Sequence, residues 1–135
     1  MRWPLLAGAA ACCALAACGG SPGDLMGISV SGGPVKGIEQ IRVTANGLAD
    51  CNGGKLKQLQ SDTVLQARNV VRDATPLIKQ VASFPPAAAG RRTFELRTPD
   101  GNISWGEGTA GLPAVLPQAE LLAVQLEPLC GRQGG

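Results

Sequence analysis

The sequence predicts an α+β domain of order ββαββα, in which two helices cover one face of a four-stranded antiparallel sheet. Apolar and polar residues alternate in two pairs of short segments, which is typical of strands with one buried face. A segment with helical periodicity follows each pair. The sheet and the helices would each have one apolar face, and packing these faces together gives the α+β architecture.

The first pair of strands is expected between residues 28 and 45. Ile28 and Val30 alternate with serines in the first strand, and the apolar residues of the second are Ile41, Val43 and Ala45. Gly-Gly-Pro at residues 32–34 is a strong turn signal between them. Asn-Gly pairs at 46–47 and 52–53 indicate loops after the second strand.

A long amphipathic helix is expected next. Its apolar stripe consists of Leu56, Leu59, Thr63, Ala67, Val70, Ala74, Leu77 and Val81. Ser61 or Asp62 is the expected cap at its start. Pro76 interrupts the stripe, so the chain either kinks there or begins a new turn with Thr75 as the cap.

The second pair of strands reads as a hairpin followed by the last helix. The turn is Thr-Pro-Asp-Gly-Asn at residues 98–102, after a Pro- and Ala-rich loop. The alternating apolar residues beside it are Phe94, Leu96, Ile103 and Trp105. Helical spacing returns over residues 117–127, at Ala119, Leu122, Ala123 and Leu126.

The chain begins with a short basic start and an apolar run over residues 5–17, which is shorter than the about 20 residues that span a bilayer. The run ends in Leu-Ala-Ala-Cys-Gly at residues 15–19, which resembles the lipobox of bacterial lipoproteins. That resemblance implies a signal peptide over residues 1–17 and diacylglycerol attached to Cys18. Cys12 and Cys13 have no bulky aliphatic residue three positions earlier. The alternative is an ordinary secretory signal with an incidental thiol at Cys18.

The expected product is a protein held on the extracytoplasmic face of the cell membrane by its lipid, because two acyl chains are enough for stable anchoring. Residues 18–26 would form a flexible tether, 27–130 a single domain and 131–135 a disordered tail. Twelve Lys and Arg are scattered among ten Asp and Glu, so no nucleic-acid partner is expected. We expect a monomer.

After lipidation of Cys18, two cysteines would remain in the domain, Cys51 and Cys130. Two thiols of one small domain usually pair in an oxidising compartment, so a disulfide is expected. A metal site and a catalytic thiol are the alternatives, but the chain has no histidine and no Cys-x-x-Cys.

Composition argues against an enzyme. The absence of His and Tyr rules out Ser-His-Asp and Cys-His arrangements. The acidic residues Asp50, Asp62, Asp73, Asp100 and Glu107 fall at expected caps, turns or exposed helix positions. We expect no catalytic residue, no cofactor and no metal.

One further resemblance covers most of residues 27–128. Ile-Ser-Val-Ser-Gly-Gly at 28–33, Gly37, the Leu-rich helix ending near Phe84, the hairpin around residues 100–101 and a helix opening at 116–117 are together similar to emfourin. Emfourins are small inhibitors of protealysin-like, thermolysin-type metallopeptidases. The resemblance implies an inhibitor whose partner is an extracytoplasmic metallopeptidase.

The expected contact with such a partner is the connection between the first two strands: Ser31, Gly32, Gly33, Pro34, Val35, Lys36 and Gly37. Glycine permits close backbone approach and proline limits the entropy lost on binding. The side chains of Val35 and Lys36 are expected to project. A plain turn is the alternative for this segment. The alternative function is a non-enzymatic envelope lipoprotein that binds another protein, a glycan or a lipid.

Overall fold

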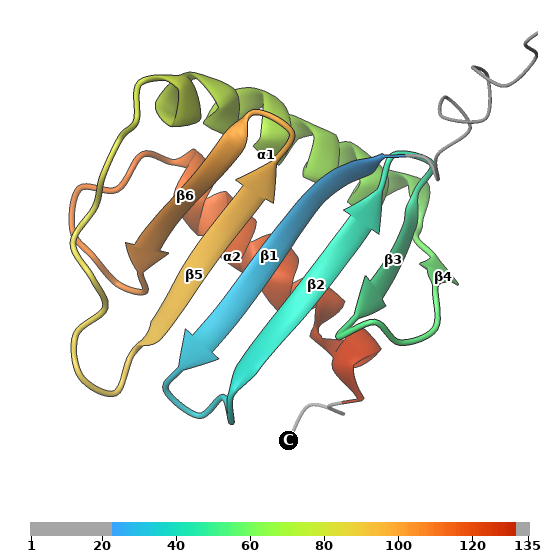
Figure 1. The fold of residues 1–135 in the computed structure, drawn as a ribbon, viewed down its shortest axis with the longest axis horizontal. Helices are drawn as coiled ribbons and strands as arrows, with labels where there is room; N and C mark the ends of the chain where they lie inside the picture. The colour runs from blue at the N-terminus through green and yellow to red at the C-terminus, as the bar shows by residue number, and fades with distance from the viewer. Residues whose placement is uncertain (1–22, 132–135) are drawn as a thin grey trace, which may run out of the picture.

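The computed structural model describes residues 23–131, and it places two helices against one face of an antiparallel sheet (Figure 1). The strand order across the sheet is β4-β3-β2-β1-β5-β6. The elements are β1 (Asp24–Gly32), β2 (Ile38–Thr44), β3 (Leu48–Cys51), β4 (Lys57–Gln58), α1 (Ser61–Lys79), β5 (Arg92–Thr98), β6 (Gly101–Gly106), α2 (Val115–Leu126) and the 3-10 helix η2 (Glu127–Cys130).

The predicted α+β class and antiparallel sheet are confirmed, but the predicted four strands and the order ββαββα are wrong. The sheet has six strands, because β3 and β4 lie between the first hairpin and α1. β3 has four residues and β4 has two, so neither is long enough to show a clear alternation. Their pairing with β2 and with each other makes them strands.

The N-terminal boundary of the domain also differs from the expectation. β1 begins at Asp24, which pairs with Thr44 of β2, so residues 24–26 belong to the sheet and not to a tether. The predicted signal peptide, Cys18 and residues 132–135 lie outside the described residues.

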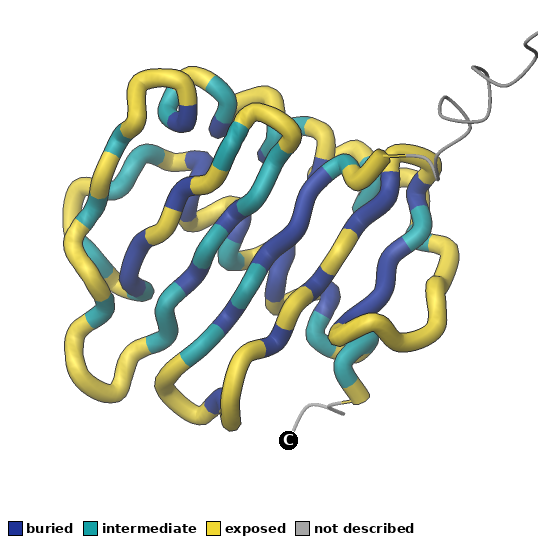
Figure 2. Tube along the Cα trace, viewed as in Figure 1, coloured by how far each residue is buried: buried dark blue, intermediate teal, exposed yellow. Residues whose placement is uncertain are grey.

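The core lies between the sheet and the helices, as the alternation of buried and exposed residues along the strands shows (Figure 2). Met26, Ile28 and Val30 of the central strand β1 face the helices and are at most 2% exposed. The buried residues of α1 are Ala67, Val70, Ala74 and Ile78, and those of α2 are Val115, Leu116, Ala119, Leu122, Ala123 and Leu126.

The helix α1 is shorter than its predicted stripe. It begins at Ser61, and its N-cap residue, Gln60, makes no side-chain capping bond, so neither Ser61 nor Asp62 is the cap. Leu56 precedes the helix and is 46% exposed, and Val81 follows it and is 85% exposed. Val81 has a φ of 53°, an unusual backbone angle for a β-branched residue.

Each of the two α-helices within residues 23–131 contains a proline. α1 continues through Pro76 to Lys79, so no new helix begins at Thr75, whose hydroxyl donates a hydrogen bond to the carbonyl of Val71. α2 begins at Val115, two residues before the prediction, and Pro117 lies in its first turn. A proline costs little there, because the first N–H groups of a helix have no partner within it.

Candidate functional site

The connection between β1 and β2 is an ordered turn at one end of the sheet. The N–H of Val35 donates to the carbonyl of Gly32 at 3.1 Å. Gly32 and Gly33 have φ angles of 80° and 57°, in the left-handed region that favours glycine. A side chain at Gly32 would also lie 2.9 Å from the carbonyl oxygen of Arg91. Both the positive φ of residue 32 and the close approach of the Arg91 carbonyl therefore require glycine at this position.

The expectation that Val35 projects from this turn is wrong. Its side chain is 9% exposed and belongs to the hydrophobic core, because the turn directs it inward. Lys36 is exposed, and so are Gly33 and Pro34. The turn is thus anchored by one apolar side chain and presents its glycines, its proline and one lysine to solvent.

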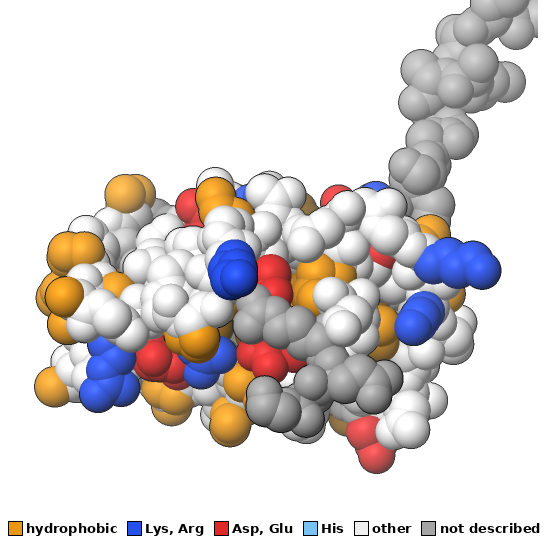
Figure 3. Space-filling view, turned by 90° about the horizontal axis from the view of Figure 1, so that it is seen from below, with side chains coloured by type: hydrophobic (Ala, Val, Ile, Leu, Met, Phe, Trp, Pro, Cys, Tyr) orange, Lys and Arg blue, Asp and Glu red, His pale blue; other side chains and the backbone are white. Residues whose placement is uncertain are grey.

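A charged cluster lies close to this turn, centred on Arg92 of β5, which is the cross-strand partner of Gly32. Arg92 pairs with Glu107 at 2.6 Å and with Glu127 at 3.3 Å, and its guanidinium lies 5.4 Å from the centre of the Phe94 ring. The hydrogen bond from Arg92 holds the pKa of Glu107 below its usual value. Seen from this end, the surface mixes basic, acidic and apolar side chains (Figure 3).

The predicted disulfide between Cys51 and Cys130 is present. The Cα atoms of the two cysteines are 5.1 Å apart, and 79 positions separate them in the sequence. The bond joins the end of β3 to η2, the 3-10 helix after α2. Cys51 is the last residue of β3.

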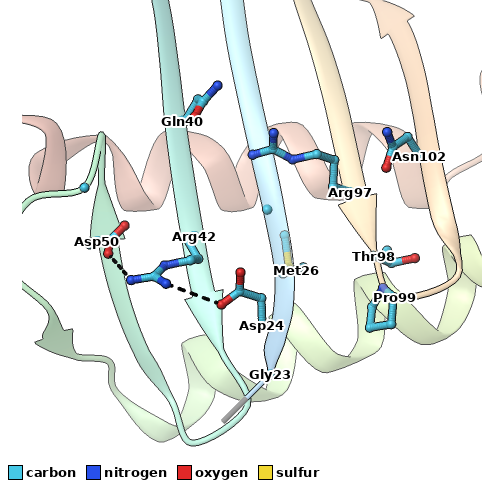
Figure 4. Close-up of a pocket in the computed structure, with 12 residues that line it drawn as sticks. Gly23, Asp24, Met26, Gln40, Arg42, Asp50, Arg97, Thr98, Pro99 and Asn102 are labelled. Carbon is cyan, nitrogen blue, oxygen red and sulfur yellow. Dashed lines mark hydrogen bonds and ion pairs between the residues drawn. The ribbon is translucent and has the colours of Figure 1, made fainter. Parts of the chain in front are cut away.

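The open face of the sheet, opposite the helices, carries a row of residues that sequence reasoning did not single out. Asp50, Arg42, Gly27, Arg97 and Asn102 are successive cross-strand partners from β3 to β6. They line part of a depression of about 750 Å³, whose side chains are drawn in Figure 4. These residues come from five strands, so only the strand register brings them together.

Asp50 is not at the cap or turn that was expected. Its side chain is 4% exposed, in β3, and accepts a hydrogen bond of 2.6 Å from Arg42. A second carboxylate, that of Asp24, lies 3.7 Å from the same guanidinium (Figure 4). Arg42 is therefore shared by two carboxylates.

The other acidic residues have ordinary structural surroundings. Asp62 is in the first turn of α1, where a negative charge is favourable, and Asp73 pairs with the adjacent Arg72. Asp100 is in the β5–β6 turn, and its N–H donates to the hydroxyl of Thr98. No group of three or more His, Cys, Asp and Glu within residues 23–131 is placed to hold a metal ion.

Comparison with protein-family models finds no match for the chain, and comparison with curated proteins finds no significant match. Between residues 23 and 131, no helix has both the length and the apolar character needed to cross a membrane.

Proposed function

We propose that this protein is a membrane-anchored inhibitor that binds a thermolysin-type metallopeptidase through the β1–β2 turn. The observation that carries the proposal is the anchored turn: Val35 is buried while Gly33, Pro34 and Lys36 are exposed. A pre-ordered segment loses little conformational entropy on binding, which is what an inhibitory loop requires. The similarity of residues 28–33 to emfourin supports the choice of target class.

The packing of the domain agrees with binding through a surface turn. The core residues Ile28, Phe94 and Leu96 are 0% exposed. A ligand cavity between sheet and helices would have favoured the alternative, a lipoprotein that carries a ligand in its interior. The well-packed core and the exposed turn favour a protein-binding module.

The direction of β1 suits an anchored inhibitor. The strand runs nine residues from Asp24 to Gly32, so its ends are separated by roughly 25 to 30 Å. The chain enters at one end and the β1–β2 turn lies at the other (Figure 1). A domain tethered through its N-terminus would therefore present the turn on the side away from the tether.

Replacing Lys36 with Glu is expected to weaken inhibition of the target peptidase at least about tenfold and to leave the melting temperature nearly unchanged. Lys36 is exposed, so its substitution should change the free energy of unfolding by less than about 0.5 kcal/mol. Changing a hot-spot side chain at the centre of an interface, in contrast, weakens the free energy of binding by about 2 kcal/mol or more. The measurement is the inhibition constant against thermolysin and against the thermolysin-type peptidases secreted by the source organism.

Lys57→Glu, an equal charge change on the exposed strand β4, is the matched control and should leave the inhibition constant unchanged. If the parent protein inhibits none of these peptidases, the proposed function is wrong. If it inhibits them and Lys36→Glu inhibits equally well, the β1–β2 turn is not the contact.

The lipid anchor is a separate part of the proposal. Cys18→Ser is expected to abolish incorporation of a labelled fatty acid and to leave an uncut precursor, because the signal peptidase that cleaves lipoproteins acts on the modified cysteine. Cys12→Ser and Cys13→Ser should leave both labelling and cleavage intact. Labelling that persists in Cys18→Ser would show that another residue carries the lipid.

A further inference from the structure

We propose that the open face of the sheet holds a second binding site, which takes a carboxylate group on the guanidinium of Arg97. The site is the depression whose lining includes Gly27 and its two cross-strand partners, Arg97 of β5 and Arg42 of β2. Figure 4 shows the two arginines. The site is distinct from the β1–β2 turn, and it does not depend on the inhibitory function.

Arg97 and Arg42 are the two cationic residues that line this depression. Among residues 23–131, no hydrogen bond or ion pair of the Arg97 side chain is found, although the residue is only partly exposed. Arg42, on the other side of Gly27, is paired with both Asp50 and Asp24. The cluster of Arg42 with two carboxylates has a net charge of −1, and Arg97 is the cation of this depression with no ion pair of its own among residues 23–131.

Gly27 supplies the space in which this guanidinium lies. A Cβ atom at Gly27 would lie 3.1 Å from Nη2 of Arg97 and 3.3 Å from its Nε. The φ of Gly27 is not in the left-handed region, so the backbone does not require a glycine here. Glycine in the interior of a central strand reduces stability, and it often marks a place that another group approaches closely.

The surroundings of Arg97 fit a carboxylate. Guanidinium binds carboxylate through two parallel N–H donors, and the side chain of Asn102, its cross-strand partner, is a further amide donor on the same face (Figure 4). The volume of about 750 Å³ is within the range of small-ligand sites. None of the lining residues is aromatic, so the depression lacks the stacking surface that would favour a sugar or a base.

The balance of charge selects a monoanion over a phosphate dianion. A dianion would need a second free cation, but Arg42 is already committed to two carboxylates, and these would repel the extra negative charge. A single carboxylate carries one negative charge, which the guanidinium of Arg97 can pair with by itself. Its source is either the C-terminus of a peptide or an acidic side chain.

The test is a titration of the full chain, labelled with ¹⁵N, with four small probes. N-acetyl-Ala-Ala carries only a terminal carboxylate, N-acetyl-Glu-amide only a side-chain carboxylate, N-acetyl-Ala-amide no carboxylate, and inorganic phosphate tests the dianion. We expect at least one carboxylate probe to shift the amide signals of Gly27, Arg97 and Asn102, and the uncharged probe to shift none. The probe that binds more tightly identifies the source.

Two variants distinguish an effect on carboxylate binding from an effect on the stability of the fold. Arg97→Gln should weaken carboxylate binding at least tenfold, and Gly27→Ala should do the same by displacing the guanidinium, with a melting temperature equal to or above that of the parent. Arg72→Gln, on the exposed face of α1, is the matched control and should bind like the parent. Absence of carboxylate binding by the parent, tighter binding of phosphate than of carboxylate, or unchanged affinity in Arg97→Gln would overturn the proposal.

Discussion

Replacing Cys51 and Cys130 together with alanine is expected to lower the free energy of unfolding by about 2 to 5 kcal/mol. The disulfide spans 79 positions, and the chain-entropy estimate for a loop of that length is about 4.5 kcal/mol. The bond also holds β3 against η2, and β3 is a strand of only four residues. Because the net stability of a small domain is about 5 to 15 kcal/mol, this loss is a large part of the total.

Denaturant unfolding of the double variant, compared with the parent before and after reduction, measures this effect. The reduced parent and the double variant should unfold at similar denaturant concentrations. Cys18→Ser removes a cysteine outside the pair and should not change the stability of the oxidised domain. Equal stability of the double variant and the oxidised parent would contradict the prediction, as would free thiols at Cys51 and Cys130 in the unreduced protein.

Trp105→Ala is expected to destabilise the domain by about 3 to 5 kcal/mol. Trp105 is 1% exposed and stacks on Phe94 with ring centroids 5.7 Å apart. Its Nε1 donates a 2.8 Å hydrogen bond to Oε1 of Glu120, which links β6 to α2. The substitution would leave a cavity between sheet and helix and a carboxylate without its donor, and both effects reduce stability.

Trp105→Phe separates these two effects. It keeps an aromatic ring beside Phe94 but removes the N–H, so its expected cost is smaller, about 1 to 3 kcal/mol. Adding Glu120→Gln to it should recover part of that cost, because a neutral amide is less costly to leave without a donor than a carboxylate. A cost below about 1 kcal/mol for Trp105→Ala would contradict the packing described here.

Local signals predicted the elements that are long and regular. The hairpin of β5 and β6 was found because Phe94, Leu96, Ile103 and Trp105 alternate around a strong turn signal. β3 was missed because it is short and because its central Asp50 looks like a loop residue. A buried aspartate is explained only by its pairing with Arg42, which is a property of the sheet and not of the local sequence.

The same distinction applies to the candidate sites. Turn chemistry predicted a break at residues 32–34, but it did not predict that Val35 would point into the core, since side-chain direction depends on the φ and ψ angles of the turn. No local sequence pattern indicates the site on the open face of the sheet. Arg97 and Gly27 are far apart in the chain, and the pairing of β1 with β5 places them side by side in the sheet.

The two edges of the sheet limit the ways in which a partner can bind. On one side the last strand is β4, which offers two residues, Lys57 and Gln58. On the other side, the backbone of Ala87 packs so closely on Gly106 of β6 that a side chain there would collide with it. Short edge strands, lysine and a covering segment are the means by which proteins prevent a second chain from extending their sheet. We therefore expect partners to bind this domain through its turns and its open face, and copies of it not to associate edge to edge.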